Sequence, residues 1–276
     1  MKIPFAKMSG AGNDFVVIDN RSGKVKDGSR LARRICDRKW GVGADGLILL
    51  ENSAEAEYRM MYYNADGSYG GMCGNGGRCI ARFAVDKGLA GSVHRFEALG
   101  YIYDSIVKPD VVLLTMKDPV RMKMGIVLPL GSSKLKLHFV DTGSPHVVIP
   151  IAQLVKRYRT LEAIPVTTIG RKIRYHKSFS PEGTNVNFIE RTKAGSIRIR
   201  TYERGVEEET LACGTGSIAS ALIASRLWKV SSPVEVIPAS GATLEVSFRV
   251  KGSEYSNVVL RGQAVTTFTG EFDVEG

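Results

Sequence analysis

Alternating hydrophobic and polar residues run through much of this chain and predict mainly β-structure. In the segment 196–202, Ile197, Ile199 and Thr201 fall on one face of an extended strand, and the intervening positions fall on the other. Similar short segments rich in Val, Ile, Leu, Tyr and Phe recur in both halves, including FVVID, GLILLE, YRMMYYN, VVLLTM, LKLHFV, HVVIP, NVNFIE, LEVSFRV and NVVL. We therefore expect strands to be the main element of the fold.

Helical spacing is confined to a few segments between these strands. Leu31 and Ile35 lie at helical spacing after Ser29, a residue type that commonly caps a helix. Three further helices are expected, over about residues 76–87, over about 151–159 and directly after Cys213.

The helix after Cys213 differs from the others in composition. Residues 214–225, GTGSIASALIAS, contain no charged side chain. A helix that is apolar or small on every side is buried all round, and this one is too short for the roughly 20 residues that cross a bilayer. We expect it to run through the centre of a domain, wrapped by strands.

The predicted order of elements occurs twice along the chain. Each half has a strand, a helix, further strands, a helix preceded by Cys-Gly-x-Gly, and strands again; MYYNADGSYGGMCGNG aligns with RTYERGVEEETLACGTG, with Tyr63 over Tyr202. The copies are too long and too divergent for a solenoid repeat. We predict two related domains, residues 1–117 and 118–262, and expect a cleft between them.

Composition and charge narrow the classes of function. The chain has 276 residues, of which 43% are hydrophobic and 24% charged, as is typical of globular proteins. The formal net charge of +10 raises the question of nucleic-acid binding, but the basic residues are scattered and the one cluster, GRKIRYHK at 170–177, is short. Because no common nucleic-acid module is recognisable, we expect the charge to be solvated or to attract acidic small molecules.

The sequence does not predict a membrane or secreted protein. No apolar run approaches the roughly 18 residues of a membrane span, and the start of the chain lacks the apolar core of a signal peptide. We therefore expect a cytoplasmic location, in which the four cysteines stay reduced rather than forming a disulfide framework.

Two of the cysteines, Cys73 and Cys213, directly precede a predicted helix that opens with Gly-x-Gly. The first backbone N–H groups of a helix are unpaired and its dipole places about half a positive charge there. Such a setting is expected to lower the pKa of the thiol and to offer N–H groups to a carboxylate. Two such sites facing one carbon would let one thiolate remove a proton while the opposite thiol returns one, which inverts a stereocentre without a cofactor.

Two other uses of the cysteines and glycines, a zinc site and a dinucleotide site, do not fit their spacing and order. Zinc is not expected, because Cys73 and Cys79 are spaced C-x₅-C and the four histidines form no ligand pair. A dinucleotide cofactor is not expected either, since GVGADG at 41–46 follows a helix and precedes a strand, the reverse of the required order. Cys36 and Cys79 lie within helix patterns and are expected to be structural. Thiol–disulfide exchange by Cys73 and Cys213 remains the main alternative.

Four segments resemble the motifs of one family, the cofactor-independent diaminopimelate epimerases: KMSGAGNDFVVID, CDRKWGVGADGLI, NADGSYGGMCGNGGRC and ERGVEEETLACGTGS. The resemblance runs essentially from end to end. It implies an α/β (α+β) fold of two pseudo-symmetric domains, each a strand barrel around a central buried helix, with the active site between them. It also implies that the C-terminal strand, residues 263–276, returns to the first domain.

The resemblance further implies roles for individual residues. Cys73 and Cys213 would be the acid–base pair. The backbone N–H groups that hold the reacting carboxylate would come from Gly74, Asn75, Gly214 and Thr215. The rest of the substrate would be bound by Asn13, Asn64, Asn185, Glu203 and Arg204, while His146 and Glu203 would modulate the cysteines.

The chain departs from the family pattern at three places. Ser144 stands where the family usually has asparagine before Pro-His, and Gly46 stands where some members have glutamine. ERGVEEET is one residue longer than the commoner ERGxGET form. These departures concern contacts with the distal end of the substrate, for which Ser144 and Gly46 are candidates, rather than the reacting carbon.

These observations lead to the hypothesis of an enzyme that interconverts LL- and meso-2,6-diaminopimelate in lysine and peptidoglycan precursor synthesis. The expected partner is this small molecule, with no metal, cofactor, nucleic acid or membrane. A racemase for another amino acid, of the histidine or proline type, is the alternative within the class. The thiol–disulfide oxidoreductase is the alternative outside it, and the sequence leaves a homodimer open.

Overall fold

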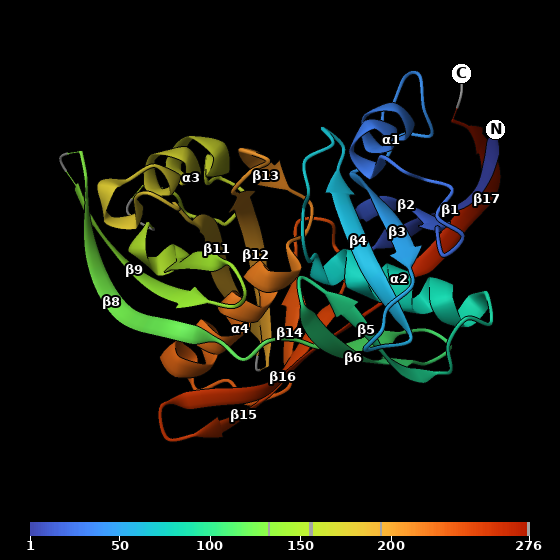
Figure 1. The fold of residues 1–276 in the computed structure, drawn as a ribbon. Helices are drawn as coiled ribbons and strands as arrows, with labels where there is room; N and C mark the ends of the chain where they lie inside the picture. The colour runs from blue at the N-terminus through green and yellow to red at the C-terminus, as the bar shows by residue number, and fades with distance from the viewer. Residues whose placement is uncertain (132, 155–156, 194, 275–276) are drawn as a thin grey trace. The chain divides into compact units, whose positions relative to one another are not determined.

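The computed structural model describes residues 1–131, 133–154, 157–193 and 195–274, which form a strand-rich α+β fold with few helices (Figure 1). The chain divides into two units, one of Met1–Thr115 with Arg261–Gly276 and one of Met116–Leu260. None of the described helices has the length and apolar content that crossing a membrane would need.

The first unit contains one continuous set of paired strands. In order of pairing they are β17 (Val265–Asp273), β1 (Lys2–Gly10), β2 (Asn13–Asp19), β3 (Gly46–Glu51), β4 (Tyr58–Asn64), β5 (Val93–Ala98), β6 (Tyr101–Val107) and β7 (Val112–Thr115). Only β2–β3 and β4–β5 are parallel. Because parallel neighbours need a crossover, each of these pairs is joined through a helix, α1 (Gly28–Ile35) and α2 (Gly74–Asp86) respectively.

The second unit repeats this arrangement. Its strands pair in the order β8 (Val120–Leu130), β9 (Ser133–Asp141), β10 (Pro145–Pro150), β11 (Asn185–Lys193), β12 (Ser196–Glu203), β14 (Val234–Ile237) and β15 (Leu244–Lys251), with β13 (Glu208–Thr210) beside the end of β12. The strand β16 (Glu254–Gly262) follows β15 along the chain. The parallel pairs β10–β11 and β12–β14 are again joined through helices, α3 (Val166–Arg174) and α4 (Gly214–Trp228). The predicted pseudo-symmetry of the fold is confirmed.

The second crossover helix of each unit is the central one. Residues 216–224 of α4 are all buried, and the helix contacts β9, β10, β11, β12, β14 and β15. In the first unit α2 contacts β1, β2, β3, β4, β6, β7 and β17 (Figure 1). The prediction that the uncharged segment 214–225 runs through the centre of its domain is therefore confirmed for α4, since a segment without charges can be surrounded by strands at little cost.

Two details of the predicted helices were wrong. The cap of α1 is Asp27, whose carboxylate accepts from the backbone N–H of Arg30 at 2.9 Å, and Ser29 lies inside the first turn. Both residue types can cap a helix, and Asp27 is the one that precedes the turn. The helix expected over about 151–159 is a single 3₁₀ turn at Ile151–Gln153, and residues 155–156 lie outside the described part of the chain.

The crossover helix that the sequence analysis does not predict is α3. The sequence analysis treats the basic residues of this stretch only as a short charged cluster. The buried residues of α3 are Val166, Ile169, Gly170 and Ile173, the spacing of one helical face. The arginines and lysines of the same stretch, Arg171, Lys172 and Arg174, lie in its last turn, where cations are stabilised by the helix dipole. The apolar spacing, rather than the basic residues, was the informative signal.

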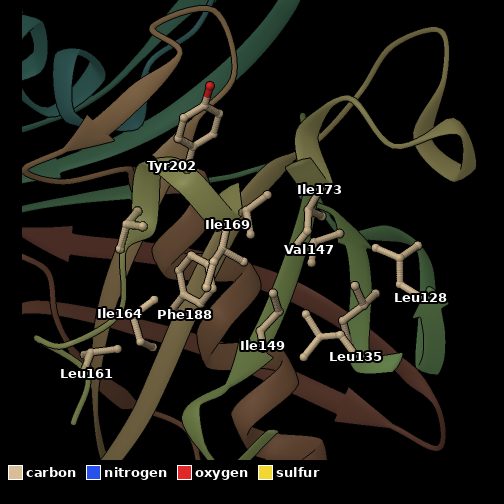
Figure 2. Close-up of a cluster of buried hydrophobic side chains, with 13 residues drawn as sticks. Leu128, Leu135, Val147, Ile149, Leu161, Ile164, Ile169, Ile173, Phe188 and Tyr202 are labelled. Carbon is tan, nitrogen blue, oxygen red and sulfur yellow. The ribbon is translucent and has the colours of Figure 1, made fainter. Parts of the chain in front are cut away.

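A buried cluster fixes α3 against β10, β11 and β12 (Figure 2). Ile169 and Ile173 of the helix pack with Val147 and Phe188 of the strands and with Tyr202 of β12. The contact is close at Gly170, where an added Cβ would lie 2.4 Å from the Cβ of Tyr202. Tyr202 directly precedes the Glu203–Arg204 pair, so this packing also fixes the strand end that carries those residues.

We expect Gly170→Ala to destabilise the protein, although glycine-to-alanine changes in an exposed helix are usually stabilising by about 1 kcal/mol. The new methyl group would collide with Tyr202, and such overpacking costs about 1–3 kcal/mol. Urea unfolding of the variant should show this fall in the free energy of unfolding. The matched control is Gly91→Ala, where the nearest atom is 3.8 Å away; equal stability of the two variants would contradict the prediction.

Candidate active site

Cys73 and Cys213 occupy the same structural position, the N-cap of the central helix of their unit. Their backbone angles are nearly equal, with φ −118° and ψ 123° for Cys73 and φ −126° and ψ 115° for Cys213. The sulfur of Cys73 accepts from the N–H of Gly76 at 3.5 Å, and that of Cys213 from the N–H of Gly216 at 3.4 Å. Each sulfur thus takes the place of the side-chain oxygen that usually caps a helix.

Glycine three residues after each cysteine leaves room for the strands beneath the cap. A Cβ on Gly216 would lie 2.5 Å from Oδ1 of Asn187 and 3.2 Å from the sulfur of Cys213. A Cβ on Gly76 would lie 3.0 Å from Cδ1 of Ile48. In both helices the residues between the cysteine and this glycine belong to the first turn, where backbone N–H groups have no acceptor within the helix and can bind a carboxylate.

A buried polar cluster surrounds Cys213. The hydroxyl of Thr215 lies 3.6 Å from the sulfur of Cys213 and 2.9 Å from Nε2 of His146. The hydroxyl of Ser144 lies 2.9 Å from the same nitrogen of His146. Three residues singled out from the sequence therefore meet beside the second cysteine.

Asn187, which the sequence analysis did not single out, determines the tautomer of His146. Its side-chain N–H₂ donates to the carbonyl oxygen of Val147 at 2.8 Å and to Nδ1 of His146 at 3.1 Å. Since a carbonyl oxygen can only accept, the amide orientation is settled and Nδ1 is the acceptor. The proton of the neutral ring is therefore on Nε2, directed to the hydroxyls of Ser144 and Thr215.

His146 is completely buried. Burial, and to a smaller extent the charge of Arg204, lowers the pKa of His146 to about 3. The ring is consequently neutral at physiological pH, so it acts on Thr215 and Ser144 as a hydrogen-bonding group rather than as a charge.

The remaining residues of the second unit extend this cluster. Asn185 donates to the carbonyl oxygen of Pro145 at 3.0 Å and accepts from the backbone N–H of Arg204 at 2.8 Å. Its N–H₂ also lies 3.5 Å from the Ser144 hydroxyl. Glu203 accepts from the hydroxyl of Thr210 at 2.8 Å. One network thus connects Cys213, Thr215, His146, Ser144, Asn185 and Arg204.

In the first unit the residues near Cys73 form a different network. Asn75 donates to Oδ1 of Asn13 at 2.6 Å, and Asn13 donates to the carboxylate of Asp45 at 2.9 Å. The guanidinium of Arg78, a second residue that the sequence analysis missed, donates to Oδ1 of Asn75 at 2.8 Å and to the carbonyl oxygen of Gly74 at 3.2 Å. Its signal in the sequence was a charged residue within a helix that is otherwise small or apolar over its first turns.

Asn64 and Gly46 are neighbours across the β3–β4 pair. The side chain of Asn64 accepts from the hydroxyl of Tyr62 at 2.8 Å and donates to that of Ser68 at 2.9 Å, rather than joining Asn13 and Asn75. A Cβ on Gly46 would lie 2.5 Å from the ring of Tyr62. A longer side chain at position 46 would therefore require this ring to move.

The other two cysteines do not cap the start of a central helix: Cys36 is the C-cap of α1, and Cys79 lies inside α2 directly after Arg78. Burial raises the pKa of Cys36 and of Cys79 to about 12, so both remain thiols that behave as small apolar side chains. Within the described part of the chain, no group of three His, Cys, Asp or Glu side chains is arranged to hold a metal ion.

The burial of neutral His146 predicts a specific pH dependence of stability. The pKa in the folded state is below that of an exposed histidine, so the unfolded chain binds the proton more readily and stability falls as pH falls below about 6.5. In His146→Gln this contribution, at most about 1.4 kcal/mol per pH unit for one proton, is absent. Urea unfolding between pH 7.5 and 4.5 should therefore show a shallower decline for the variant.

The matched control is His176→Gln, which changes a histidine outside this cluster and should decline as steeply as the unchanged protein. The variant His146→Gln should be less stable at pH 7.5, because it loses buried hydrogen bonds, and should approach the unchanged protein at acid pH. Parallel curves for His146→Gln and the unchanged protein would contradict a buried, neutral His146.

The folds of solved proteins are similar to this one. A probable proline racemase from Agrobacterium radiobacter matches with a TM-score of 0.74 at 14% identity, over 99% of this chain and 93% of that one. A phenazine biosynthesis protein of the PhzF family from Bacillus anthracis matches with a TM-score of 0.72 at 15% identity, over 99% of this chain and 100% of that one. At these identities the similarity concerns the fold alone.

Sequence comparisons are more specific. The family model described as diaminopimelate epimerase matches residues 5–122 and 138–267. The diaminopimelate epimerase of Chlorobaculum tepidum is 46% identical over 95% of this chain and 98% of its own length, and that of Archaeoglobus fulgidus is 40% identical over 87% and 88%. The chain therefore belongs to the diaminopimelate epimerase family and is an isomerase.

Proposed function

We propose that this enzyme interconverts LL- and meso-2,6-diaminopimelate by moving the α-proton between Cys73 and Cys213, without a cofactor. The observation that carries the proposal is the equivalent position of the two cysteines, each with its sulfur at the N-cap of a central helix. Two groups of one chemical type in one local geometry suit a reaction that must run in both directions. The pathway that we propose for it is the synthesis of lysine and peptidoglycan precursors in the cytoplasm.

In the proposed reaction, the thiolate of one cysteine takes the proton from the α-carbon, and its electron pair remains on that carbon. The thiol of the other cysteine then donates its proton to the opposite face. The configuration is inverted, and the two cysteines have exchanged their protonation states. The proposal therefore requires both sulfurs to reach one α-carbon from opposite faces in the substrate complex.

The main energetic difficulty is the negative charge that develops beside the carboxylate. The first-turn N–H groups at Gly74, Asn75, Gly214 and Thr215 would bind this carboxylate, and the positive ends of both helix dipoles would stabilise the added charge. Fixed dipoles of this kind need no rearrangement during the reaction. They stabilise the transition state more than the substrate, which is the condition for catalysis.

The rest of the substrate would be bound by the asparagines and by Arg204. Asn13, Asn64 and Asn185 are neutral side chains that both donate and accept, which suits the ammonium and carboxylate groups of an amino acid. The guanidinium of Arg204 suits a bidentate grip on the distal carboxylate. Asn185 accepts from the backbone N–H of Arg204, so the two are positioned together.

The test is proton NMR in D₂O with LL-diaminopimelate and the reduced enzyme, with no oxidant or cofactor added. We expect deuterium to enter at an α-carbon while the meso isomer appears. If only another amino acid, such as proline or histidine, exchanges its α-proton, the enzyme is a racemase of different specificity. If no amino acid exchanges and the cysteines instead cycle with a disulfide substrate, the oxidoreductase alternative replaces the proposal.

Variants of the cysteines test the two-base mechanism directly. Because the serine hydroxyl is a poor base at neutral pH, we expect Cys73→Ser and Cys213→Ser each to lower kcat for epimerisation about 10²-fold or more. The matched control is Cys36→Ala, which changes a buried cysteine at the C-terminal end of α1, and this variant should keep its kcat. Near-normal activity in either serine variant would rule out the paired-cysteine mechanism.

A further inference from the structure

Arg78 is a fully buried cation in the first half of α2, five residues after Cys73. Its guanidinium donates to the carbonyl oxygen of Gly74 at 3.2 Å and to Oδ1 of Asn75 at 2.8 Å, and its Nε has no hydrogen-bond partner. Both hydrogen-bond partners are uncharged. A buried cation without a charged partner is costly, so a nearby anion is expected to balance it.

Carboxylates do not supply this balance. The nearest acidic groups in the network, Asp14 and Asp45, are reached only through Asn75 and Asn13, and they already pair with Lys7 and Arg38. The ion pairs measure 2.8 Å for Lys7 with Asp14 and 2.8 Å for Arg38 with each carboxylate. Burial alone would raise the pKa of Asp14, but hydrogen bonds from Arg38 and Lys7 lower this pKa to about 2. Two cations and two anions neutralise each other there.

The other ionisable groups turned inward around α2 are neutral near pH 7. Burial raises the pKa of the Cys79 thiol to about 12 and lowers the pKa of His94, which pairs with a tyrosine hydroxyl at 3.0 Å. The buried phenols of the surrounding strands, which ordinarily carry no charge at this pH, are Tyr58, Tyr62 and Tyr103. The guanidinium interacts electrostatically with the sulfur of Cys79 and, to a smaller extent, with that of Cys73. Because burial keeps Cys79 a thiol, the sulfur of Cys73, next to the Gly74 carbonyl that accepts from Arg78, is the group left to balance the cation.

Among the described residues of the second unit, which carries Cys213, no lysine or arginine is buried as Arg78 is. The residue that matches Arg78 in α4, five positions after the cysteine, is Ile218. The group connected to Cys213 through Thr215 is His146, which is neutral. The charged residues nearest to this cluster along β12, Glu203 and Arg204, have opposite signs and are only partly buried. Cys213 is itself almost completely buried, which favours the uncharged thiol.

We propose that Arg78 is a positioning residue that holds Cys73 as the thiolate in the resting enzyme and leaves Cys213 as the thiol. The inference rests on the proposed function, because it assigns the starting roles of its two cysteines. The resting enzyme would then be ready for the isomer whose α-proton is presented to Cys73. After that turnover Cys73 holds the proton and Cys213 is the thiolate, and one proton must pass from Cys73 to Cys213, through solvent or the reverse reaction, to restore the resting form.

The test measures alkylation by iodoacetamide, which reacts with thiolates, as a function of pH, with peptide mass spectrometry to separate the cysteines. In the unchanged protein we expect the pH midpoint of alkylation to be lower for Cys73 than for Cys213. We compare these pH midpoints rather than the alkylation rates, because the two sulfurs differ in exposure. A lower midpoint for Cys213 would overturn the proposal without any variant.

Variants then assign the effect to Arg78. We expect Arg78→Met to raise the Cys73 midpoint by about one pH unit or more, about a tenfold change in the ionisation constant of its thiol, and to leave the Cys213 midpoint in place. Arg78→Lys keeps the charge and should restore most of the shift. The matched control is Arg82→Met, one turn further along α2, whose guanidinium donates to the carbonyl oxygens of Lys108 and Pro109.

An unchanged Cys73 midpoint in Arg78→Met, or equal shifts in Arg78→Met and Arg82→Met, would overturn the proposal. Because alkylation needs no turnover, this result is independent of epimerase activity. If the Cys73 midpoint lies below the Cys213 midpoint but no deuterium enters a substrate, the role of Arg78 stands while the proposed function fails. If deuterium enters the substrate but the Cys213 midpoint is the lower one, the proposed function stands while the role of Arg78 fails.

Discussion

The unpaired N–H groups at the start of a buried helix are the constraint on which both halves of this structure depend. When a helix is surrounded by strands, the backbone N–H groups of its first turn need hydrogen-bond acceptors within the protein or on a ligand. In α2 and α4 the first acceptor is a cysteine sulfur, at 3.5 Å and 3.4 Å from the third N–H. The remaining N–H groups of the turn suit an anion.

This constraint explains the composition of the segments around the cysteines. Glycine stands at the third position after each cysteine, because a side chain there would meet the strands beneath, Ile48 in one unit and Asn187 in the other. The uncharged segment 214–225 of α4 follows from the same burial. One physical requirement, a helix enclosed by strands with an accessible first turn, accounts for both the fold and the proposed chemistry.

The two units share topology but differ in the electrostatics of their caps. Beneath Cys73 the first unit places a buried guanidinium, whereas beside Cys213 the second unit places a neutral histidine, two hydroxyls and an amide. A duplicated fold thus supplies equal geometry with unequal charge. For the proposed proton transfer this difference would be useful, because an acid and a base must differ in protonation although they are the same residue type.

The sequence by itself determined the elements whose pattern is local. The absence of charge over residues 214–225 of α4, the alternation in β12 and the repeated Cys-Gly-x-Gly predicted the strand-rich, pseudo-symmetric fold with a central helix, because burial on all sides or on one side leaves a direct signal in the sequence. The crossover helix α3 carried the same kind of signal at Val166, Ile169 and Ile173, but its basic residues obscured it.

Only the tertiary structure decided which polar residues meet. Asn187 and His146 are 41 positions apart, and their contact follows from the parallel register of β10 and β11, which pairs His146 with Asn185. Likewise the complete burial of Arg78 depends on the strands that surround α2. Hydrogen-bond partners and local dielectric arise from residues distant in the chain, and for that reason the charge state of a site is a property of the folded protein.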